Sequence, residues 1–585
     1  MRDAAAHSTG NIAAHLAAMA KLQPSRPAVI CARGRDARGE VAYAQLSFRE
    51  LNDASDRLAR SLEAIGIRRG VRTALMLPPS LDFFSVTFAL FKLGAVPVLI
   101  DPGIGLANLR GCLAHAQPEA FVGVSKAHAA RVVLGWARSS VRIKVTAGKK
   151  WFWGGHSLSG LLASRGQGQG RSVSADEPAA RYPFAAIEPE AGETAAILFT
   201  SGSTGAPKGA VYTHAMFNAQ VEHIRQLYGI APGEMDLATF PLFALFGPAL
   251  GMTAVVPEMD ASRPAGVDPM NIVSAIEKFG ITNMFGSPAL INRVARYGEA
   301  HAIKLPSLRR AISAGAPMPA RVLARFAAML SPGVQVFTPY GATECLPVAS
   351  IGSGEILDET RHRTDQGAGV CVGRPLPGVS VKVVRISDDP ISNWSDDLEL
   401  PAGEVGEIVV RAGHASGSYF NLPLATALAK IHDAAGFYHR MGDLGYFDQS
   451  GRLWFCGRKA HRVVTQRAPE AGAETRFSIP CEGVFNVHPK VYRTALVGVA
   501  RNGITEPVLC VELEAGARDD PPDTIREELR RLGAGHAHTR DISTFLFHPA
   551  FPVDVRHNAK IFREKLASWA AKKMAAKELA AGKLG

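Results

Sequence analysis

A loop of small and hydroxylated residues, closed by a lysine, occupies positions 199–209 and reads Phe-Thr-Ser-Gly-Ser-Thr-Gly-Ala-Pro-Lys-Gly. It follows the apolar run Thr194–Phe199, which has the character of a buried strand. Such a loop exposes backbone N–H groups and hydroxyls at one point in space, as a polyphosphate requires. Lys208 adds a fixed positive charge. Gly209 stands where a Walker A loop needs Ser or Thr, so the pattern favours a different phosphate-binding loop over that motif or a flexible surface loop.

Further motifs follow this loop along the chain, and their order is informative. They are Ser313-Ala-Gly-Ala-Pro317, Tyr340-Gly-Ala-Thr-Glu344, Arg440-Met-Gly-Asp443, Gly457-Arg458 and Asn558-Ala-Lys560-Ile-Phe-Arg563. In this order they resemble the acyl-adenylate-forming superfamily, which includes acyl-CoA synthetases, luciferases and nonribosomal adenylation domains. The resemblance extends from about Leu46 to Leu566 and includes Ala89–Pro97.

The resemblance implies ATP and Mg²⁺ as cofactors and assigns roles to individual residues. The β- and γ-phosphates would be wrapped by Thr200, Ser201, Gly202, Ser203, Thr204, Gly205 and Lys208. The adenine ring would lie against Gly315, Ala316 and Pro317, with Gly341 nearby and Tyr340 either stacked on the base or buried in the core. Thr343 would bind the α-phosphate, and Glu344 with Thr200 would hold Mg²⁺, a cation that prefers oxygen ligands.

The remaining implied roles concern the ribose and the chemistry. Asp443 would accept both ribose hydroxyls, because an ionised carboxylate takes two donors at once, and Arg458 would assist there. Lys560 is the expected catalytic residue, together with Thr343 and Glu344. A lysine between an attacking carboxylate and the α-phosphate would neutralise charge that builds in the transition state.

Departures from the superfamily pattern bear on the second half of the reaction. Ala244 stands where many acyl-CoA synthetases carry an aromatic or histidine gate, Ala460 replaces the hinge Asp or Lys, and Met441 replaces the Thr before Gly-Asp. The stretch Thr465–Phe477 has no match to the loop that lines the thioester-forming site. These changes argue against use of CoA and leave adenylation untouched.

The run Phe240–Asp260 looks like that of the bacterial olefin-biosynthesis synthetases. That resemblance implies activation of a long-chain 2-alkyl-3-hydroxy acid as acyl-AMP, followed by attack of the 3-hydroxyl to give a β-lactone, AMP and pyrophosphate. A complex with other enzymes of hydrocarbon biosynthesis is then possible. The alternatives are a fatty acyl-CoA or acyl-AMP ligase, and a non-catalytic regulator or membrane-surface module. His214, His439 and His461 are the candidate bases for the hydroxyl.

Strand and helix patterns alternate along the first part of the chain and predict the elements that position these motifs. Expected helices include Ser47–Gly66 and Leu81–Leu93, and expected strands include Ala95–Ile100 and Ala120–Val124. The alternation favours an α/β fold with parallel-sheet layers. Val379–Val384 and Gly406–Arg411 predict a small β-rich lobe, whereas the stretch 154–181 is expected to be an exposed loop.

We therefore expect three units. Residues 1–456 would form the N-terminal adenylate-forming domain, residues 457–461 a hinge, and residues 462–585 a smaller, mobile α+β domain that carries Lys560. The chain ends in an Ala/Lys helix, Ala567–Leu579, for which a solvated terminal helix is favoured over a membrane-surface helix.

Composition limits the class of protein. The net charge is +12, yet there is no run of five Lys/Arg and no RNA-binding pattern of aromatic and basic residues, which argues against a nucleic-acid partner. The longest apolar region, Leu81–Ile100, is interrupted by Asp82, Lys92 and Pro97 and is a poor membrane span. Seven dispersed cysteines without CxxC spacing suggest reduced thiols and a cytoplasmic location.

Overall fold

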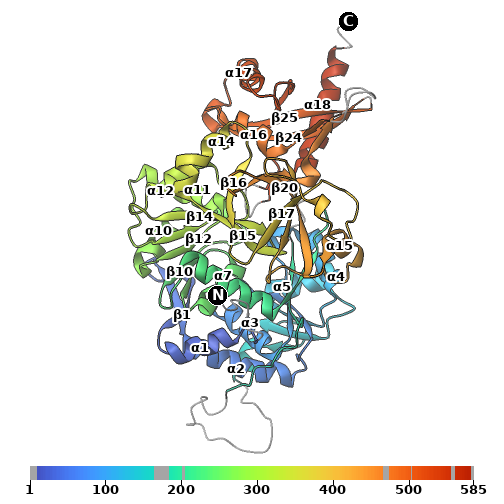
Figure 1. Cartoon of the computed structure of the whole chain (residues 1–585). Coiled ribbons are helices and arrows are strands. Elements are labelled where there is room, and N and C mark those ends of the chain that lie inside the picture. The colour runs from blue at the N-terminus through green and yellow to red at the C-terminus, as the bar shows by residue number, and fades with distance from the viewer. Residues whose placement is uncertain are drawn as a thin grey trace, which may run out of the picture.

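The computed structural model describes residues 10–163, 183–200, 205–465, 474–501, 503–554 and 560–581. In these residues two large β-sheets and a smaller C-terminal part are flanked by helices, which confirms the predicted α/β class (Figure 1). The N-terminal half fills one end of the molecule, and α17 (Pro522–Ala534) and α18 (Arg563–Ala581) lie at the other.

The first sheet has the strand order β7-β6-β5-β3-β4-β8-β9 and is parallel except for the β8–β9 pair. Its strands are β3 (Arg72–Met76), β4 (Val96–Leu99), β5 (Ala120–Val124), β6 (Ile143–Ala147), β7 (His156–Ser157), β8 (Thr194–Phe199) and β9 (Gly209–Thr213). The connecting helices are α2 (Phe48–Ala64), α3 (Leu81–Leu93), α4 (Leu106–Ala116), α5 (Ser125–Leu134) and α6 (Leu158–Ala163).

Local sequence explains the ends of these helices. Ser47 and Glu50 form a capping box, in which each side chain accepts a hydrogen bond from the other's backbone N–H at the start of α2. The helix α3 starts at the cap Ser80 and ends at Gly94, whose φ of +66° only glycine adopts readily. Both helices were predicted from their apolar spacing, and α3 has the predicted bounds.

The second sheet has a parallel half and an antiparallel half that join at β14 and β15. The parallel half contains β1 (Pro27–Arg35), β11 (Thr253–Val256), β10 (Met235–Ala238), β12 (Asn283–Phe285), β13 (Arg310–Ile312) and β14 (Gln335–Ala342), with β2 (Val41–Ser47) antiparallel at its edge. Its helices are α1 (Ala14–Leu22), α7 (His214–Tyr228), α8 (Pro241–Ala244), α9 (Phe246–Leu250), α10 (Pro269–Phe279), α11 (Pro288–Ala300) and α12 (Ala320–Ala327).

The antiparallel half is the β lobe expected from the alternating patterns. It consists of β15 (Cys345–Gly352), β16 (Val370–Pro375), β17 (Ser380–Val384), β18 (Gly406–Arg411), β19 (Lys430–Asp433), β20 (Gly436–Phe447) and β21 (Leu453–Arg458), with α13 (Ser353–Glu355), α14 (Arg361–Asp365) and α15 (Pro423–Leu428) beside it. Its apolar side chains form their own cluster, which contains Tyr340, Ile408 and Met441.

The C-terminal part is α+β, as predicted. It contains β22 (Val463–Thr465), β23 (Glu474–Arg476), α16 (Ser478–Asn486), β24 (Val491–Arg501), β25 (Ile504–Leu513), β26 (Thr544–Phe547), α17 and α18. Two hydrophobic clusters lie within it, one around Phe485 and Ile525 and one around Leu546 and Leu566. The 457–461 hinge and the domain limits remain predictions; in the structure β21 ends at Arg458 and a single 3₁₀ turn spans Lys459–His461.

The segment after residue 154 contains secondary structure that the sequence did not indicate. The predicted loop 154–181 is partly wrong, because residues 156–163 form β7 and α6; residues 164–182 lie outside the described residues.

All seven cysteines are buried and unpaired, spread over several hydrophobic clusters. Burial raises the pKa of the Cys31, Cys345 and Cys510 thiols to about 12.

Candidate active site

A cavity of about 530 Å³ opens where the carboxyl ends of parallel strands from both sheets meet the C-terminal part. Open α/β sheets bind ligands at such strand ends. Six of the polar side chains that line it were predicted as site residues from the motifs: Thr200, Lys208, Thr343, Glu344, Arg458 and Lys560. The structure thus brings residues that are up to 360 positions apart to one space.

The phosphate loop is closed on itself at its base. The Thr200 N–H donates to the Lys208 carbonyl at 2.9 Å, and the Lys208 N–H donates to Thr200 Oγ1 at 3.2 Å. The Lys208 ammonium lies 5.0 Å from the ring centre of Tyr419, a cation–π distance. Gly205 also lines the cavity, whereas the predicted ligands Ser201, Gly202, Ser203 and Thr204 lie outside the described residues.

Glu344 is oriented by an aromatic hydroxyl. The Tyr419 hydroxyl donates to Glu344 Oε1 at 2.6 Å, and the Tyr212 hydroxyl donates to the Thr343 carbonyl. Burial, and then the negative charge of Glu344, raise the pKa of Tyr419 far above its ordinary value, so this hydroxyl stays a donor. Mg²⁺ is usually bound by one or two carboxylates together with substrate phosphates, so one carboxylate beside the Thr200 hydroxyl fits the ion.

The predicted ribose acceptor, Asp443, is almost fully buried at 3% exposure. Its Oδ2 accepts a hydrogen bond from the Tyr340 hydroxyl at 2.7 Å, and its Oδ1 lies 3.0 Å from Arg458 Nη1. Burial raises the pKa of Asp443, and Arg458 opposes that shift. Oδ1 makes no hydrogen bond within the described part of the chain. Asp443 itself does not line the cavity, although its neighbour Gly442 and its partner Arg458 do, so its role at the ribose remains a prediction.

The surroundings of Tyr340 favour the core position over stacking on a base, and a role in binding adenine stays a prediction. Its ring is 9% exposed and packs in the β-lobe cluster, 6.1 Å from the ring of Phe455, while its hydroxyl fixes Asp443. Ala314, Gly315 and Gly341 line the cavity where the adenine wall was expected. Ala316 and Pro317 follow on the same turn but do not line it, and their role remains a prediction.

Lys560 reaches the cavity from the C-terminal part, although residues 555–559 before it lie outside the described residues. Its carbonyl accepts a hydrogen bond from the Asp554 N–H at 2.9 Å, next to a bridge between Val553 and Ile561. The positive charge of Lys560 is near enough to lower the pKa of Asp443 slightly. This position agrees with the predicted role beside the α-phosphate.

The opposite side of the cavity is apolar and aromatic. Its lining includes Phe88, Phe91, Phe217, Phe240, Phe243, Phe246 and Phe285. A second, smaller cavity of about 70 Å³ adjoins it and is bounded by Ile224, Tyr228, Leu250 and Met252. Phe243, Phe246 and Phe285 line both cavities, so the aromatic cluster divides an apolar space into two arms.

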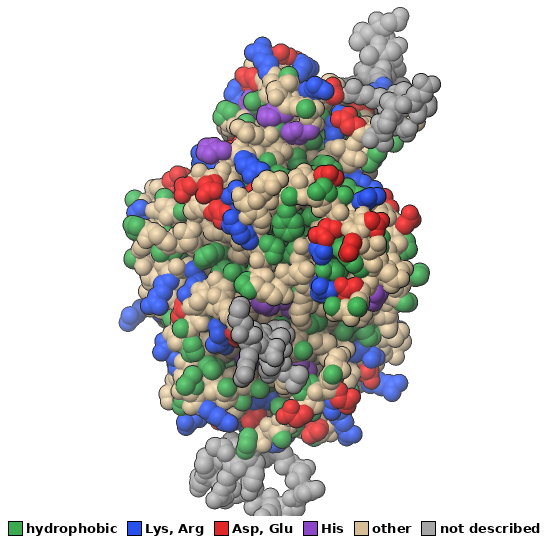
Figure 2. Space-filling model, in the orientation of Figure 1, with side chains coloured by type: hydrophobic (Ala, Val, Ile, Leu, Met, Phe, Trp, Pro, Cys, Tyr) green, Lys and Arg blue, Asp and Glu red, His purple; other side chains and the backbone are tan. Residues whose placement is uncertain are grey.

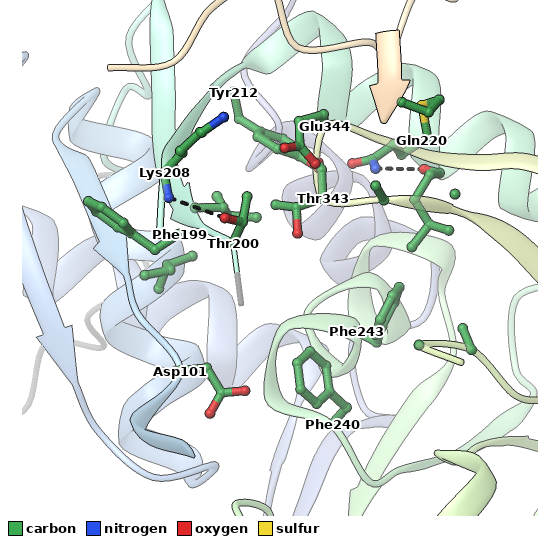
Figure 3. Close-up of a pocket in the computed structure, with 18 of the residues that line it drawn as sticks. Asp101, Phe199, Thr200, Lys208, Tyr212, Gln220, Phe240, Phe243, Thr343 and Glu344 are labelled. Atoms are coloured by element: carbon green, nitrogen blue, oxygen red, sulfur yellow. Dashed lines mark hydrogen bonds between the residues drawn. The ribbon is translucent and has the colours of Figure 1, made fainter. Parts of the chain in front are cut away.

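Sequence reasoning missed several residues of this site. Among the described residues that line the large cavity, the carboxylates are Asp101, Glu344 and Glu407. Glu407 pairs with Arg440 and Lys459, at 2.6 Å and 3.1 Å. Figure 3 shows the Asp101 carboxylate facing the same open space as Thr200, Thr343 and Phe240. The signal for Asp101 was its place at the end of β4, beside β8.

The three candidate histidines do not line the cavity. His214 is buried, accepts a hydrogen bond from the Ile12 N–H at 3.2 Å, and has its pKa lowered by burial to about 4. His439 is buried beside Lys430, with 3.0 Å between His439 Nδ1 and Lys430 Nζ. His461 lies 3.2 Å from Glu564, and burial lowers its pKa to about 4. None of them is placed to act on a ligand in the cavity.

The positions that depart from the superfamily pattern lie near the site. Met441 and Ala460 line the large cavity, and Ala244 is fully buried at the end of α8. Residues 466–473 lie outside the described residues, between β22 and β23.

Comparisons with known proteins agree with this geometry. The AMP-binding enzyme family profile matches residues 16–420. The chain is 48% identical over 567 residues to an olefin beta-lactone synthetase of Xanthomonas campestris pv. campestris, covering 96% of this chain and 97% of that protein. It is also 48% identical to an olefin beta-lactone synthetase of Stenotrophomonas maltophilia, with 96% and 98% covered. The amide bond synthetase McbA from Marinactinospora thermotolerans has a similar fold, with a TM-score of 0.74, 24% identity and 95% and 99% covered.

Proposed function

Because this chain belongs to the AMP-binding enzyme family, we propose that it is an ATP-dependent enzyme that converts a long-chain 2-alkyl-3-hydroxy acid into a β-lactone, AMP and pyrophosphate. The observation that carries the proposal is the large cavity, in which the residues predicted to bind ATP face an apolar, aromatic side. The second, smaller apolar cavity adjoins that side. The two relatives named as olefin beta-lactone synthetases support the product.

The first step is adenylation. A carboxylate oxygen of the substrate attacks the α-phosphorus of ATP, and pyrophosphate leaves. Lys208 and the loop from Thr200 to Gly205 would bind the leaving phosphates, and Thr343 would donate to the α-phosphate. Arg458, which lines the cavity, and its partner Asp443, which does not, would hold the ribose. Mg²⁺, held by Glu344 and Thr200, would neutralise phosphate charge. Lys560, which lines the same cavity, would lie between the two reacting anions and stabilise the charge that develops there.

The second step closes the ring. The oxygen of the substrate's 3-hydroxyl attacks the activated carbonyl carbon, its proton passes to a base, and the bond to AMP breaks. We assign the base to Asp101, because its carboxylate faces the open space of the cavity between the phosphate-binding residues and the aromatic wall (Figure 3). Intramolecular delivery supplies an effective molarity on the order of 10⁵ M or more, which offsets part of the ring strain.

The two apolar arms suit a branched substrate. A 2-alkyl-3-hydroxy acid carries two alkyl chains that diverge from adjacent carbons, and a cavity divided by Phe243, Phe246 and Phe285 offers each chain its own apolar surface. Burial of each CH₂ contributes about 0.8 kcal/mol, so both arms add to binding. Ala244 and Ala460 leave this reaction without the features expected for a CoA-dependent step.

The test is a product assay with ATP, Mg²⁺ and a 2-alkyl-3-hydroxy acid, followed by NMR detection of the four-membered ring. We expect one pyrophosphate and one β-lactone per ATP consumed. Adding CoA distinguishes the alternative, since an acyl-CoA ligase would give a thioester and would also accept a simple fatty acid. Pyrophosphate release without any lactone would restrict the function to acyl-AMP formation.

A further inference from the structure

More than half of the net positive charge lies in one segment, which contributes no residue to the lining of the large cavity. Residues 120–163 contain no Asp or Glu and carry seven basic residues, namely Lys126, Arg131, Arg138, Arg142, Lys144, Lys149 and Lys150. The whole chain has a net charge of +12, so more than half of the excess lies in this stretch. On the face seen in Figure 2, by contrast, basic and acidic side chains are interspersed.

The same segment exposes large apolar side chains. Val133 is 81% exposed, Phe152 77% and Trp151 54%, and Val132 of α5 is also exposed. Scattered apolar residues on a surface are ordinary, but two adjacent exposed aromatic rings beside exposed lysines point to an interaction site. We call Val132, Val133, Trp151 and Phe152, with the exposed Lys126, Lys149 and Lys150 around them, the basic aromatic face.

Ring contacts connect the two segments of this face. The buried ring of Trp153 lies 5.5 Å from the rings of both Trp151 and Phe152, and it stacks on His128 of α5 at 5.5 Å. Val132 follows His128 by four residues, so both lie on the same side of α5. The aromatic loop and α5 therefore share one surface.

The exposed rings are held by a firm base. Trp153 Nε1 donates to Thr146 Oγ1 at 3.0 Å, and Lys144 Nζ donates to the Trp153 carbonyl at 2.8 Å. The turn that follows needs glycine at position 155, where φ is +81° and a Cβ would approach the Lys144 carbonyl oxygen to 2.4 Å. Trp151 and Phe152 thus stay exposed because the fold directs the neighbouring Trp153 inward.

We propose that the basic aromatic face docks the protein on the surface of an anionic lipid bilayer. Aromatic rings at the headgroup level with lysines around them match the chemistry of such a surface. Anionic lipids attract exposed Lys and Arg near the surface, and the absence of any acidic residue from 120–163 removes the opposing repulsion. This inference stands apart from the proposed reaction, and it would bring an enzyme for long-chain substrates to the phase in which they dissolve.

The arrangement favours lipid over a protein partner. A positive face could also meet an acidic patch on a protein, but an exposed Trp between lysines has the apolar body and polar edge that suit the headgroup level of a bilayer. Among the described residues no helix has the length and hydropathy needed to cross a bilayer, so docking here means contact with the surface.

The experiment is sedimentation of the full-length protein with sucrose-loaded vesicles of phosphatidylcholine, with and without about one third phosphatidylglycerol. We expect binding to the anionic vesicles that weakens as salt rises. Lys149→Ser with Lys150→Ser should reduce the partition coefficient on the order of 30-fold, at about fivefold for each lysine. Trp151→Ala with Phe152→Ala should also reduce it at least fivefold, while adenylation activity stays unchanged.

Matched controls make the result specific. Lys572→Ser with Lys573→Ser removes the same charge from exposed positions of α18, and Leu424→Ala removes a side chain that is 82% exposed on α15. Both should bind as the unmodified protein does. Equal losses in the two lysine pairs, or no binding to anionic vesicles, would overturn the proposal. So would a protein complex that depends on Trp151 in the absence of any vesicle binding.

Discussion

Replacing Asp101 with asparagine should separate the two half-reactions of the proposed mechanism. Asp101 Oδ1 accepts a hydrogen bond from the Gly103 N–H at 2.8 Å, and an amide oxygen accepts the same bond. The substitution keeps the size of the side chain and this hydrogen bond. The amide cannot take a proton from the 3-hydroxyl, and general-base catalysis is worth about 10²- to 10⁴-fold, so ring closure should slow by that factor.

The assay follows both products in single turnovers with a 2-alkyl-3-hydroxy acid. We expect Asp101→Asn to release pyrophosphate at a rate within about threefold of the unmodified enzyme. Acyl-AMP should then accumulate, trapped with hydroxylamine, while β-lactone measured by NMR appears slowly. Asp36→Asn is the matched control, because Asp36 accepts the Arg38 N–H at 2.8 Å in a similar turn but does not line the cavity.

Two results would refute this reasoning in different ways. Lactone formation at an undiminished rate would show that Asp101 is not the base and would leave the β-lactone function standing. A parallel loss of pyrophosphate release and lactone would place Asp101 in adenylation instead. Failure of the unmodified enzyme to form any lactone would refute the function itself.

Three further predictions concern the site and its support. Lys560→Ala should lower the rate of pyrophosphate release about 10²- to 10³-fold at unchanged thermal stability, and Lys560→Arg should recover part of it; an unchanged rate would exclude Lys560 from adenylation. Glu407→Gln should lower the free energy of unfolding by about 3 to 5 kcal/mol, measured in denaturant titrations. The reason is that the side chains of Arg440 and Glu407 are each only 2% exposed, and Arg440 would lose its carboxylate partner. A loss under about 1 kcal/mol would contradict this prediction. Burial raises the pKa of Asp236 to about 7, so its protonated form favours folding; that contribution is complete below pH 4 and is lost as the pH rises through 7. Asp236→Asn should therefore flatten the decline in unfolding free energy between pH 4 and 7, and an unchanged pH profile would refute the assignment.

Much of the fold could be predicted because its elements have local signals. The helix α3 and the strands β5 and β18 have the bounds that their apolar patterns predicted, since buried runs and capping residues act over a few positions. The loop expected at 154–181 was partly wrong. The strand β7 has only two residues, so it has no apolar pattern of its own, and it forms by pairing with β6, which lies outside the stretch 154–181.

The active site, too, could be predicted only where its residues belong to local motifs. The motif residues Thr200, Lys208, Glu344 and Lys560 all line one cavity, as their order along the chain implied. Tyr419 could not be predicted as a partner of Glu344, since the two are 75 positions apart and nothing near Tyr419 forms a motif. Aromatic cavities formed by several elements, such as the two arms around Phe243, leave no local pattern either.

The buried thiols can report which regions of the protein unfold most readily. Cys31, Cys112, Cys345, Cys481 and Cys510 each belong to a different hydrophobic cluster, and none meets solvent in the native state. An alkylating reagent can modify each sulfur only after its surroundings open, because the thiolate is the reactive species and burial disfavours it. Peptide-resolved labelling over time, with and without nucleotide, would rank these regions by the rate at which they unfold. No cysteine would have to be introduced for this experiment.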